Sequence, residues 1–247
     1  MAGYIPMARE KKYLLVGVGG LGSAAALWLA KNHAGELILA DGDTVEVSNL
    51  PRQTLYSAAD IGSYKCETAV HRLQQVFPGL KCTPRKIRAD AENIEELIGE
   101  ADVVLDCTDH APSKFLIHDA AYLLEKPTVY AGAIAYETLV LGIYPQKSSC
   151  LRCLYPQLPS GPVKTAKEVG VLNAAAALGG LWEAKTAVEL AENEASNGGS
   201  LFRYDFLSGR CLFTTIERDP DCPLCGKKPT IRSITDTKAE IARRWKD

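Results

Sequence analysis

A glycine-rich turn directly after an apolar run constrains the fold more than any other feature of this chain. Residues 17–22 read GVGGLG and match G-x-G-x-x-G, between a strand-like run at 13–18 and an alanine-rich helical segment at 20–32. Glycines at this spacing allow a tight strand-to-helix turn whose backbone N–H groups and helix dipole can hold a phosphate. The glycines concerned are Gly17, Gly19, Gly20 and Gly22.

A carboxylate follows the next apolar run. Residues 37–40 form a second short strand candidate that ends at Asp41, at about the separation from the glycine turn expected for a carboxylate that binds a ribose hydroxyl. The two runs therefore predict a strand–helix–strand unit for nucleotide binding. This unit alone does not separate NAD from ATP, and tight strand–helix packing without a ligand is the alternative.

The same alternation continues along the chain and predicts a Rossmann-like, doubly wound, mostly parallel α/β sheet. Helices are expected at residues 65–77, 91–98 and 113–124, and strands at residues 81–87, 103–106, 127–130 and 138–144. Beyond Pro145 we expect a loop at 155–167, a helix at 172–192, and a hairpin of residues 201–206 and 211–216 that extends the sheet with antiparallel strands.

Two cations after the second strand favour a triphosphate over a dinucleotide. Arg52 can bind phosphate oxygens through two N–H groups, and Lys65 can act as a point charge, so together they would offset the charge of a departing pyrophosphate. Binding of a dinucleotide would not explain why two cations follow the second strand. The alternative is that each cation is a solvated surface residue.

Two Cys-x-x-Cys pairs predict a structural zinc site. The four sulfurs of Cys150, Cys153, Cys222 and Cys225 complete a tetrahedral set and leave no open position for catalysis. Redox-active or coincidental pairs are the alternative. The other cysteines, Cys66, Cys82, Cys107 and Cys211, are expected to be small buried hydrophobes, although Cys66 lies beside Lys65 near a helix start and is a candidate for a lowered pKa.

The chain is expected to form one domain. Its 247 residues suit a single unit, with a nucleotide-binding part at 1–145, a zinc-bound crossover loop, helix and hairpin at 146–230, and a C-terminal tail at 231–247. The formal net charge of −2 gives no general attraction to nucleic acid or anionic membrane. No apolar run has the length of a secretion signal or membrane span, and the cysteine pattern fits a reducing cytoplasm.

The motifs, in this order and spacing, resemble the ThiF/MoeB/HesA adenylyltransferases of the ubiquitin-activating superfamily. The resemblance covers residues 13–226 and is carried by Asp41-Gly42-Asp43-Thr44-Val45, Ser48-Asn49-Leu50-x-Arg52-Gln53, Gly62-x-x-Lys65 and Leu105-Asp106-Cys107-Thr108-Asp109. It implies that Asp41 holds the ribose, that Asn49, Arg52, Gln53 and Lys65 surround the phosphates, and that Asp109 serves Mg²⁺ and the α-phosphate. The implied cofactor-binding set also includes Asp43 and the four glycines, with Arg52, Lys65 and Asp109 as the catalytic residues.

The resemblance implies ATP-dependent adenylylation of the C-terminal glycine carboxylate of a ubiquitin-like sulfur-carrier protein, in thiamine or molybdopterin biosynthesis. A separate sulfur donor and a homodimer are part of the same expectation. No general base is needed, because a carboxylate is already ionised at neutral pH. The alternatives are adenylation of another carboxylate, such as a peptide C-terminus or a modified tRNA nucleoside, an NAD-dependent oxidoreductase, and a noncatalytic scaffold.

The chain departs from the family pattern at three places. Residues 163–170 lack the reactive cysteine that relatives often carry there, His110 stands where relatives have asparagine, and Arg9 is the only arginine before the first strand. A covalent step at residues 163–170 is therefore in doubt, whereas adenylation does not need that cysteine. We expect a structural role for Asp106, core positions for Trp28 and Trp182, and no catalytic role for His110.

Overall fold

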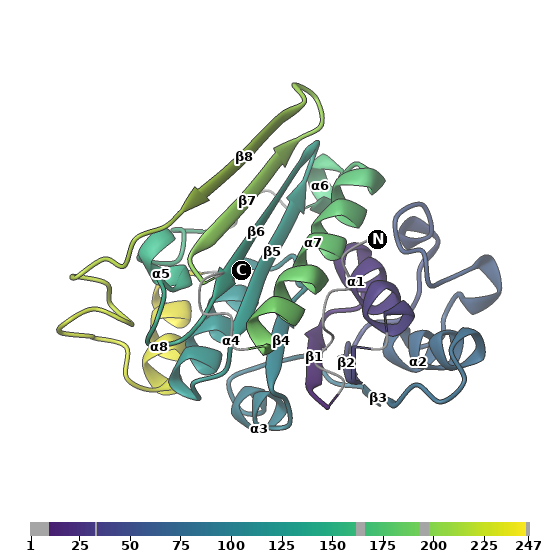
Figure 1. Cartoon of the computed structure of the whole chain (residues 1–247), viewed down its shortest axis with the longest axis horizontal. Coiled ribbons are helices and arrows are strands. Elements are labelled where there is room, and N and C mark those ends of the chain that lie inside the picture. Colours follow the sequence, from purple (N-terminus) through teal and green to yellow (C-terminus); the bar gives the residue numbers. More distant parts are fainter. Residues whose placement is uncertain (1–9, 33, 162–165, 193–197, 246–247) are drawn as a thin grey trace.

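One eight-stranded sheet organises the molecule (Figure 1). The computed structural model describes residues 10–32, 34–161, 166–192 and 198–245. The strands lie in the order β3-β2-β1-β4-β5-β6-β7-β8. Their bounds are β1 Lys12–Val16, β2 Glu36–Ala40, β3 Cys82–Arg85, β4 Val103–Asp106, β5 Thr128–Ile134, β6 Glu137–Ile143, β7 Ser200–Asp205 and β8 Arg210–Thr215.

The sheet has a parallel half and an antiparallel half. Strands β3, β2, β1, β4 and β5 pair in parallel, and β5, β6, β7 and β8 pair antiparallel. The Rossmann-like part and its antiparallel extension are confirmed. The sheet is mixed, however, because four of its strand pairs are parallel and three are antiparallel. The prediction of a mostly parallel sheet therefore understates the antiparallel part.

Helices cover both faces of the sheet, as the sequence predicted. Along β1 the side chains alternate: Tyr13 and Leu15 join a core with α1 (Gly20–Lys31), α2 (Lys65–Val76) and α7 (Asn173–Ala191), whereas Leu14 and Val16 join a core with α3 (Ile94–Gly99), α4 (Ala111–Leu123) and α8 (Ile234–Arg244). Two one-turn helices, α5 (Leu151–Leu154) and α6 (Ala166–Val169), and two 3₁₀ turns, Val47–Asn49 and Ala58–Asp60, complete the described structure. Burial on both faces explains why these strands are continuous apolar runs.

The largest difference from the sequence prediction lies at the C-terminal end. The segment expected as a tail contains α8, which begins with a capping box between Ser233 and Asp236 and packs Ile234 against the core. The helix expected at 91–98 begins only at Ile94, because Asp90 accepts hydrogen bonds from the N–H groups of the preceding turn.

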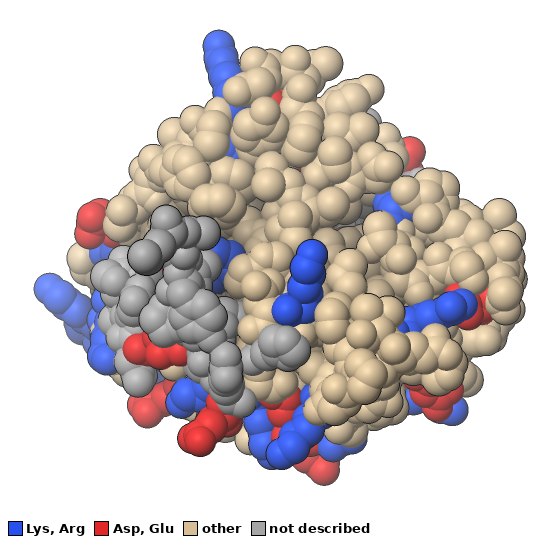
Figure 2. All heavy atoms as spheres, turned by 45° about the vertical axis from the view of Figure 1, so that its right-hand side comes forward, with Lys and Arg blue, Asp and Glu red and all other residues tan. Residues whose placement is uncertain are grey.

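The tryptophans lie where the sequence predicted, and the charged side chains are distributed over the surface. Trp28 and Trp182 are partly buried against the core, as expected. On the face shown in Figure 2, charged side chains of both signs lie interspersed along the lower half, and the described residues drawn there form no broad basic surface. Among the helices that the structure describes, none is long and apolar enough to cross a membrane.

Candidate functional site

The glycine turn is as tight as its sequence predicts. Gly17 has φ +92°, a value that favours glycine. A Cβ on Gly22 would lie 2.1 Å from the Gly17 carbonyl oxygen, and a Cβ on Gly17 would lie 3.0 Å from the Cys107 carbonyl oxygen. Gly17 and Gly22 therefore have no room for a side chain, and the turn lies directly against the carboxyl end of β4.

The turn occupies the point where the strand order reverses. Strand β1 pairs with β2 on one side and with β4 on the other, so the loops after these three strands meet at one edge of the sheet. Open α/β sheets place ligands at this edge and at this reversal. Asp41 and Asp109 follow β2 and β4, so the topology brings both to the glycine turn.

Asp41 is held by backbone groups on both of its oxygens. Oδ2 accepts a hydrogen bond of 2.8 Å from the Val18 N–H of the glycine turn, and Oδ1 accepts one of 2.8 Å from the Asp43 N–H. Burial raises the pKa of this carboxyl despite these bonds. Asp41 thus fixes the turn to the end of β2, and its remaining lone pairs could accept ribose hydroxyls.

Lys65 reaches the same place from the first position of α2. Its side chain is 9% exposed, and Nζ lies 3.3 Å from Asp43 Oδ2. The Lys65 N–H also donates to the Asp43 carbonyl. The expectation that Lys65 is a candidate site residue is therefore consistent with its placement, because a buried cation paired with Asp43, two residues after Asp41, is not a solvated surface lysine.

The loop after β2 places the predicted polar residues against the glycine turn. A Cβ on Gly20 would lie 3.6 Å from the Arg52 carbonyl oxygen, and a Cβ on Gly19 would lie 3.6 Å from Gln53 Nε2. Arg52 Nη1 donates to the Ser48 carbonyl at 2.7 Å.

Gln53, in the loop after β2, has a side chain whose hydrogen bonding is incomplete. Its side chain is buried, and Oε1 has no hydrogen-bond partner among the residues that the structure describes. A buried amide oxygen without a partner is costly, so this position fits a polar ligand over the turn. Asn49, also buried, accepts a hydrogen bond from the Glu46 N–H and so caps the 3₁₀ turn Val47–Asn49, which lies just before Arg52 in the chain.

Asp109 and Asp106 at the end of β4 have different environments. Asp109 is exposed, and its carboxylate makes no hydrogen bond or ion pair within the described residues. Asp106 is fully buried: it accepts from Thr108, and it lies 3.3 Å from Lys114 Nζ and 3.2 Å from His118 Nε2. Although burial opposes ionisation, these partners hold the pKa of Asp106 below its ordinary value. The structural role expected for Asp106 is confirmed.

Several polar residues around the site were not found from the sequence. The Tyr56 hydroxyl lies 2.8 Å from the Val18 carbonyl oxygen and 3.2 Å from the Lys65 carbonyl oxygen, so it joins the glycine turn to the start of α2. Lys114 donates to the Ala131 carbonyl and lies over the Tyr130 ring. The motif that ends at Gln53 gives a weak signal for Tyr56 three residues later, but no local pattern marks Lys114.

Glu183 on α7 is a buried carboxyl beneath the site. It is fully buried, Oε2 accepts the Cys107 thiol at 3.4 Å, and Oε1 has no hydrogen-bond partner in the described part of the chain. Burial, followed by the charge of Asp106, raises its pKa to about 8. The side chain is therefore mostly neutral in the folded protein at pH 7.

Glu183→Gln is expected to stabilise the protein increasingly as the pH rises from about 4.5 to about 8. In this window the unfolded chain releases the Glu183 proton and the folded chain keeps it, so the wild type loses stability with rising pH. The gain at pH 7 is at most about 3 kcal/mol, since one pKa unit corresponds to about 1.4 kcal/mol. Thermal unfolding of both proteins at pH 5 and at pH 8 measures this difference in stability. An equal difference between the two proteins at both pH values would contradict a raised pKa.

The expected burial of Cys66 is confirmed, whereas its candidate lowered pKa and the expected burial of Cys211 are wrong. Cys66 is fully buried, and burial together with the charge of Asp41 raises its pKa, whereas proximity to Lys65 had suggested a lowered one. Cys211 is exposed, because β8 is the edge strand of the sheet. Cys82 and Cys107 are buried, as expected.

The four paired cysteines converge on one place between α5 and the segment after β8. Their sulfurs all lie within 4.8 Å of one another, and the Sγ–Sγ distances include 3.9 Å for Cys150–Cys153, 3.5 Å for Cys150–Cys222 and 3.3 Å for Cys153–Cys225. A tetrahedral site with metal–sulfur bonds of about 2.3 Å requires about 3.8 Å between sulfurs. The donor set therefore fits a four-coordinate structural metal.

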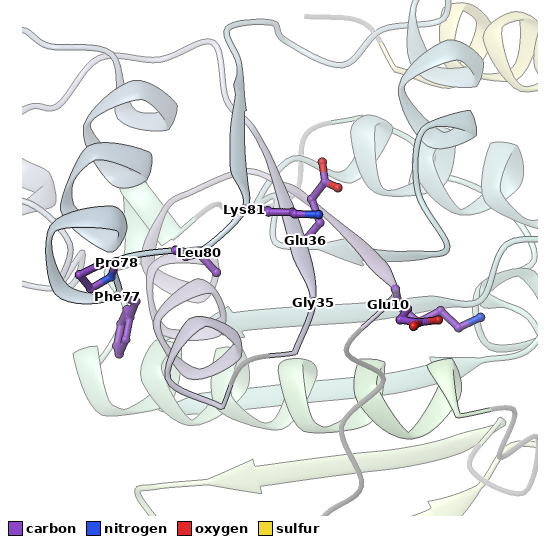
Figure 3. A pocket seen from close by; sticks show the side chains of 9 residues that line it. Glu10, Gly35, Glu36, Phe77, Pro78, Leu80 and Lys81 are labelled. Atoms are coloured by element: carbon purple, nitrogen blue, oxygen red, sulfur yellow. The ribbon is translucent and has the colours of Figure 1, made fainter.

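One hollow in the described structure lies away from these groups. It measures about 350 Å³ and is lined by residues at the amino ends of β1 and β2 and just before β3, including Glu10, Glu36 and Lys81 (Figure 3). The glycine turn and Asp41 lie at the opposite edge of the sheet, so this hollow is not part of the candidate site.

Two expectations fall outside the described residues. Arg9 lies there, as does part of the segment 163–170 in which the family's cysteine is absent.

Comparisons with known proteins agree with the geometry. The model of the ThiF family matches residues 7–224. The sulfur carrier protein adenylyltransferase of Thermus thermophilus is 34% identical over 238 residues, which cover 94% of this chain and 88% of that protein. The sulfur carrier protein ThiS adenylyltransferase of Escherichia coli is 33% identical over 218 residues, covering 88% and 86%.

Longer relatives and solved structures match as well. The adenylyltransferase and sulfurtransferase MOCS3 of Sus scrofa is 35% identical over 228 residues, which cover 90% of this chain and 50% of that protein. The crystal structure of E. coli MccB with MccA-N7isoASN has a TM-score of 0.78 at 20% identity, covers 89% of this chain and 68% of that one, and shows a shared fold. With a family model that spans most of its length, this chain belongs to the ThiF family.

Proposed function

We propose that this chain adenylylates the C-terminal carboxylate of a ubiquitin-like sulfur-carrier protein, using ATP. One observation carries the proposal: several groups suited to a nucleotide lie together where the strand order reverses. They are the glycine turn, whose N–H groups can bind phosphate, the carboxylate of Asp41, which can accept ribose hydroxyls, and the cations Arg52 and Lys65. Relatives of nearly the same length are named adenylyltransferases of sulfur-carrier proteins, which supports the assignment of the substrate.

Different residues would bind different parts of the nucleotide. The N–H groups of the glycine turn and the start of α1 would hold the phosphates, and Asp41 would accept the ribose hydroxyls. Arg52 and Lys65 would neutralise the phosphates, with Asn49 and Gln53 in the wall of the site. Asp43 holds Lys65 in place through the contact at 3.3 Å.

The chemistry needs alignment and charge neutralisation. The carrier's ionised carboxylate attacks the α-phosphorus, an O–P bond forms, the bond to the β-phosphate oxygen breaks, and pyrophosphate leaves. Asp109 is a hard oxygen ligand at the open edge and suits Mg²⁺, which would supply charge neutralisation at the α-phosphate. Arg52 and Lys65 would stabilise the charge that develops on the leaving pyrophosphate.

Further features belong to the same proposal. Zn²⁺ at Cys150, Cys153, Cys222 and Cys225 would be structural, because four protein sulfurs leave no open position. A single domain, a homodimer, a cytoplasmic location and a separate sulfur donor are proposed on the family resemblance.

ATP–pyrophosphate exchange tests the function. Purified protein is incubated with Mg²⁺, ATP, labelled pyrophosphate and candidate carriers that end in Gly-Gly. Exchange is expected to depend on the carrier and to fall by about 10²-fold in Arg52→Ala and in Asp109→Ala, because each variant loses a charged group at the reacting phosphates. Arg72→Ala, which removes an arginine of α2 that is paired with Asp60, is the matched control and should exchange like the wild type.

The other outcomes separate the alternatives. ATP binding without exchange for any carrier would point to another carboxylate acceptor or to a scaffold. Binding of NAD(H) in place of ATP would overturn the proposal.

A further inference from the structure

Arg88 lies beside the candidate site although no motif includes it. It follows β3 by three residues, and its side chain is 82% exposed. A Cβ on Gly42 would lie 3.0 Å from the Arg88 nitrogen. The backbone at Arg88 therefore packs directly against the turn from Asp41 to Asp43.

Asp43 connects Arg88 with Lys65. Arg88 Nη2 donates to Asp43 Oδ1 at 2.6 Å, and Lys65 Nζ donates to Asp43 Oδ2 at 3.3 Å. Although partial burial opposes ionisation, Arg88 and Lys65 together hold the pKa of Asp43 below its ordinary value. Asp43 therefore stays ionised at neutral pH and fixes one edge of the guanidinium.

We propose that Arg88 stacks its guanidinium on the base of the bound nucleotide. This inference rests on the proposed function. With the phosphates over the glycine turn at β1 and the ribose at Asp41 after β2, the nucleotide continues away from Arg52, toward the carboxyl end of β3 where Arg88 lies. Strand β3 is the neighbour of β2 in the sheet.

The chemistry of the guanidinium fits this position. It is planar, weakly hydrated and stacks on aromatic faces. One hydrogen bond to Asp43 orients it and leaves its plane open to solvent, which is where a base would lie. Because every base presents a π-face, Arg88 contributes affinity for the nucleoside part of the ligand and leaves the phosphate end unaffected.

Binding of three ligands to the chain of 247 residues, measured by isothermal titration calorimetry, tests the inference. In Arg88→Ala, the Kd values for Mg²⁺-ATP and for AMP are expected to rise by the same factor, about three- to tenfold, while the Kd for pyrophosphate changes less than twofold. Arg88→Lys keeps the charge near Asp43 but lacks a planar group, so it should resemble Arg88→Ala. Arg72→Ala, also an arginine paired with an aspartate, should bind all three ligands like the wild type.

The ligands whose affinity falls in Arg88→Ala show whether the inference holds. An AMP Kd within twofold of wild type in Arg88→Ala, with ATP still bound, overturns it and leaves the proposed function intact. An equal loss for pyrophosphate, rescued by Arg88→Lys, assigns Arg88 a role by charge and also overturns it. If the wild type binds no ATP, the proposed function fails, and the inference fails with it.

Discussion

Replacement of Arg152 by methionine is expected to lower the free energy of unfolding by about 3–5 kcal/mol, the usual cost of leaving a buried charge without its partner. Arg152 lies between Cys150 and Cys153 in the sequence, and its side chain is fully buried. Nε and Nη2 donate to the two oxygens of Asp119 at 3.0 and 2.6 Å, and Nη1 donates to Glu240 at 2.8 Å. The variant would leave the fully buried Asp119 with the Thr237 hydroxyl, at 2.8 Å, as its remaining hydrogen-bond donor.

Urea unfolding measures the loss, and two further variants define its origin. Arg203→Met removes an arginine from an exposed pair with Glu137 and should cost less than about 1 kcal/mol. The double variant Arg152→Met/Asp119→Leu removes both buried charges and should recover most of the stability. If Arg152→Met costs no more than Arg203→Met, the buried pair does not hold α4, α5 and α8 together.

The parallel half of the fold could be predicted because its signals are local. The glycine turn, the apolar strands on either side of it and Asp41 lie within 30 residues, and each carries a physical requirement that few other structures share. Strands buried on both faces read as apolar runs whatever their partners are. For this reason β4, at Val103–Asp106, has the bounds that were expected.

The buried charges could not be predicted, because their partners are far away in the sequence. Arg152 pairs with residues 33 and 88 positions away, and Glu183 meets a cysteine 76 positions away. From sequence alone, a charged residue is expected at the surface. Burial of these groups depends on how helices α4, α7 and α8 pack, which a local pattern does not contain.

Cys66 is buried as expected, but its neighbour in the sequence, Lys65, gave the wrong direction for the pKa shift of the thiol. The adjacent Lys65 suggested a stabilised thiolate, but the Lys65 side chain is directed to Asp43, while Cys66 is buried near the carboxylate of Asp41. Cys211 was expected to be buried but is exposed. Its strand contains apolar residues, yet β8 lies at the edge of the sheet, and all six of its residues are exposed.

Loss of the metal proposed at the four paired cysteines is expected to be the most destabilising change. Purified protein should contain about one equivalent of zinc per chain by elemental analysis. Cys222→Ser should lower both the zinc content and the midpoint of thermal unfolding, the latter by more than about 8 °C, since a loss of several kcal/mol shifts the midpoint of a domain of this size by about 2–4 °C per kcal/mol. Cys211→Ser, a cysteine outside the cluster and exposed, is the matched control and should keep the zinc and the midpoint.

The size of the effect follows from what the cluster joins. Cys150 and Cys222 are 72 residues apart, and the chain between them contains α7 and the β7–β8 hairpin. Leu151 and Leu224, next to the ligands, pack in a small core with Leu141 and Ile143 of β6. Without the metal, a small apolar core and the Arg152 pair would have to close this long loop alone. A zinc-free protein with the same midpoint as Cys211→Ser would therefore show that packing, not metal, closes the loop.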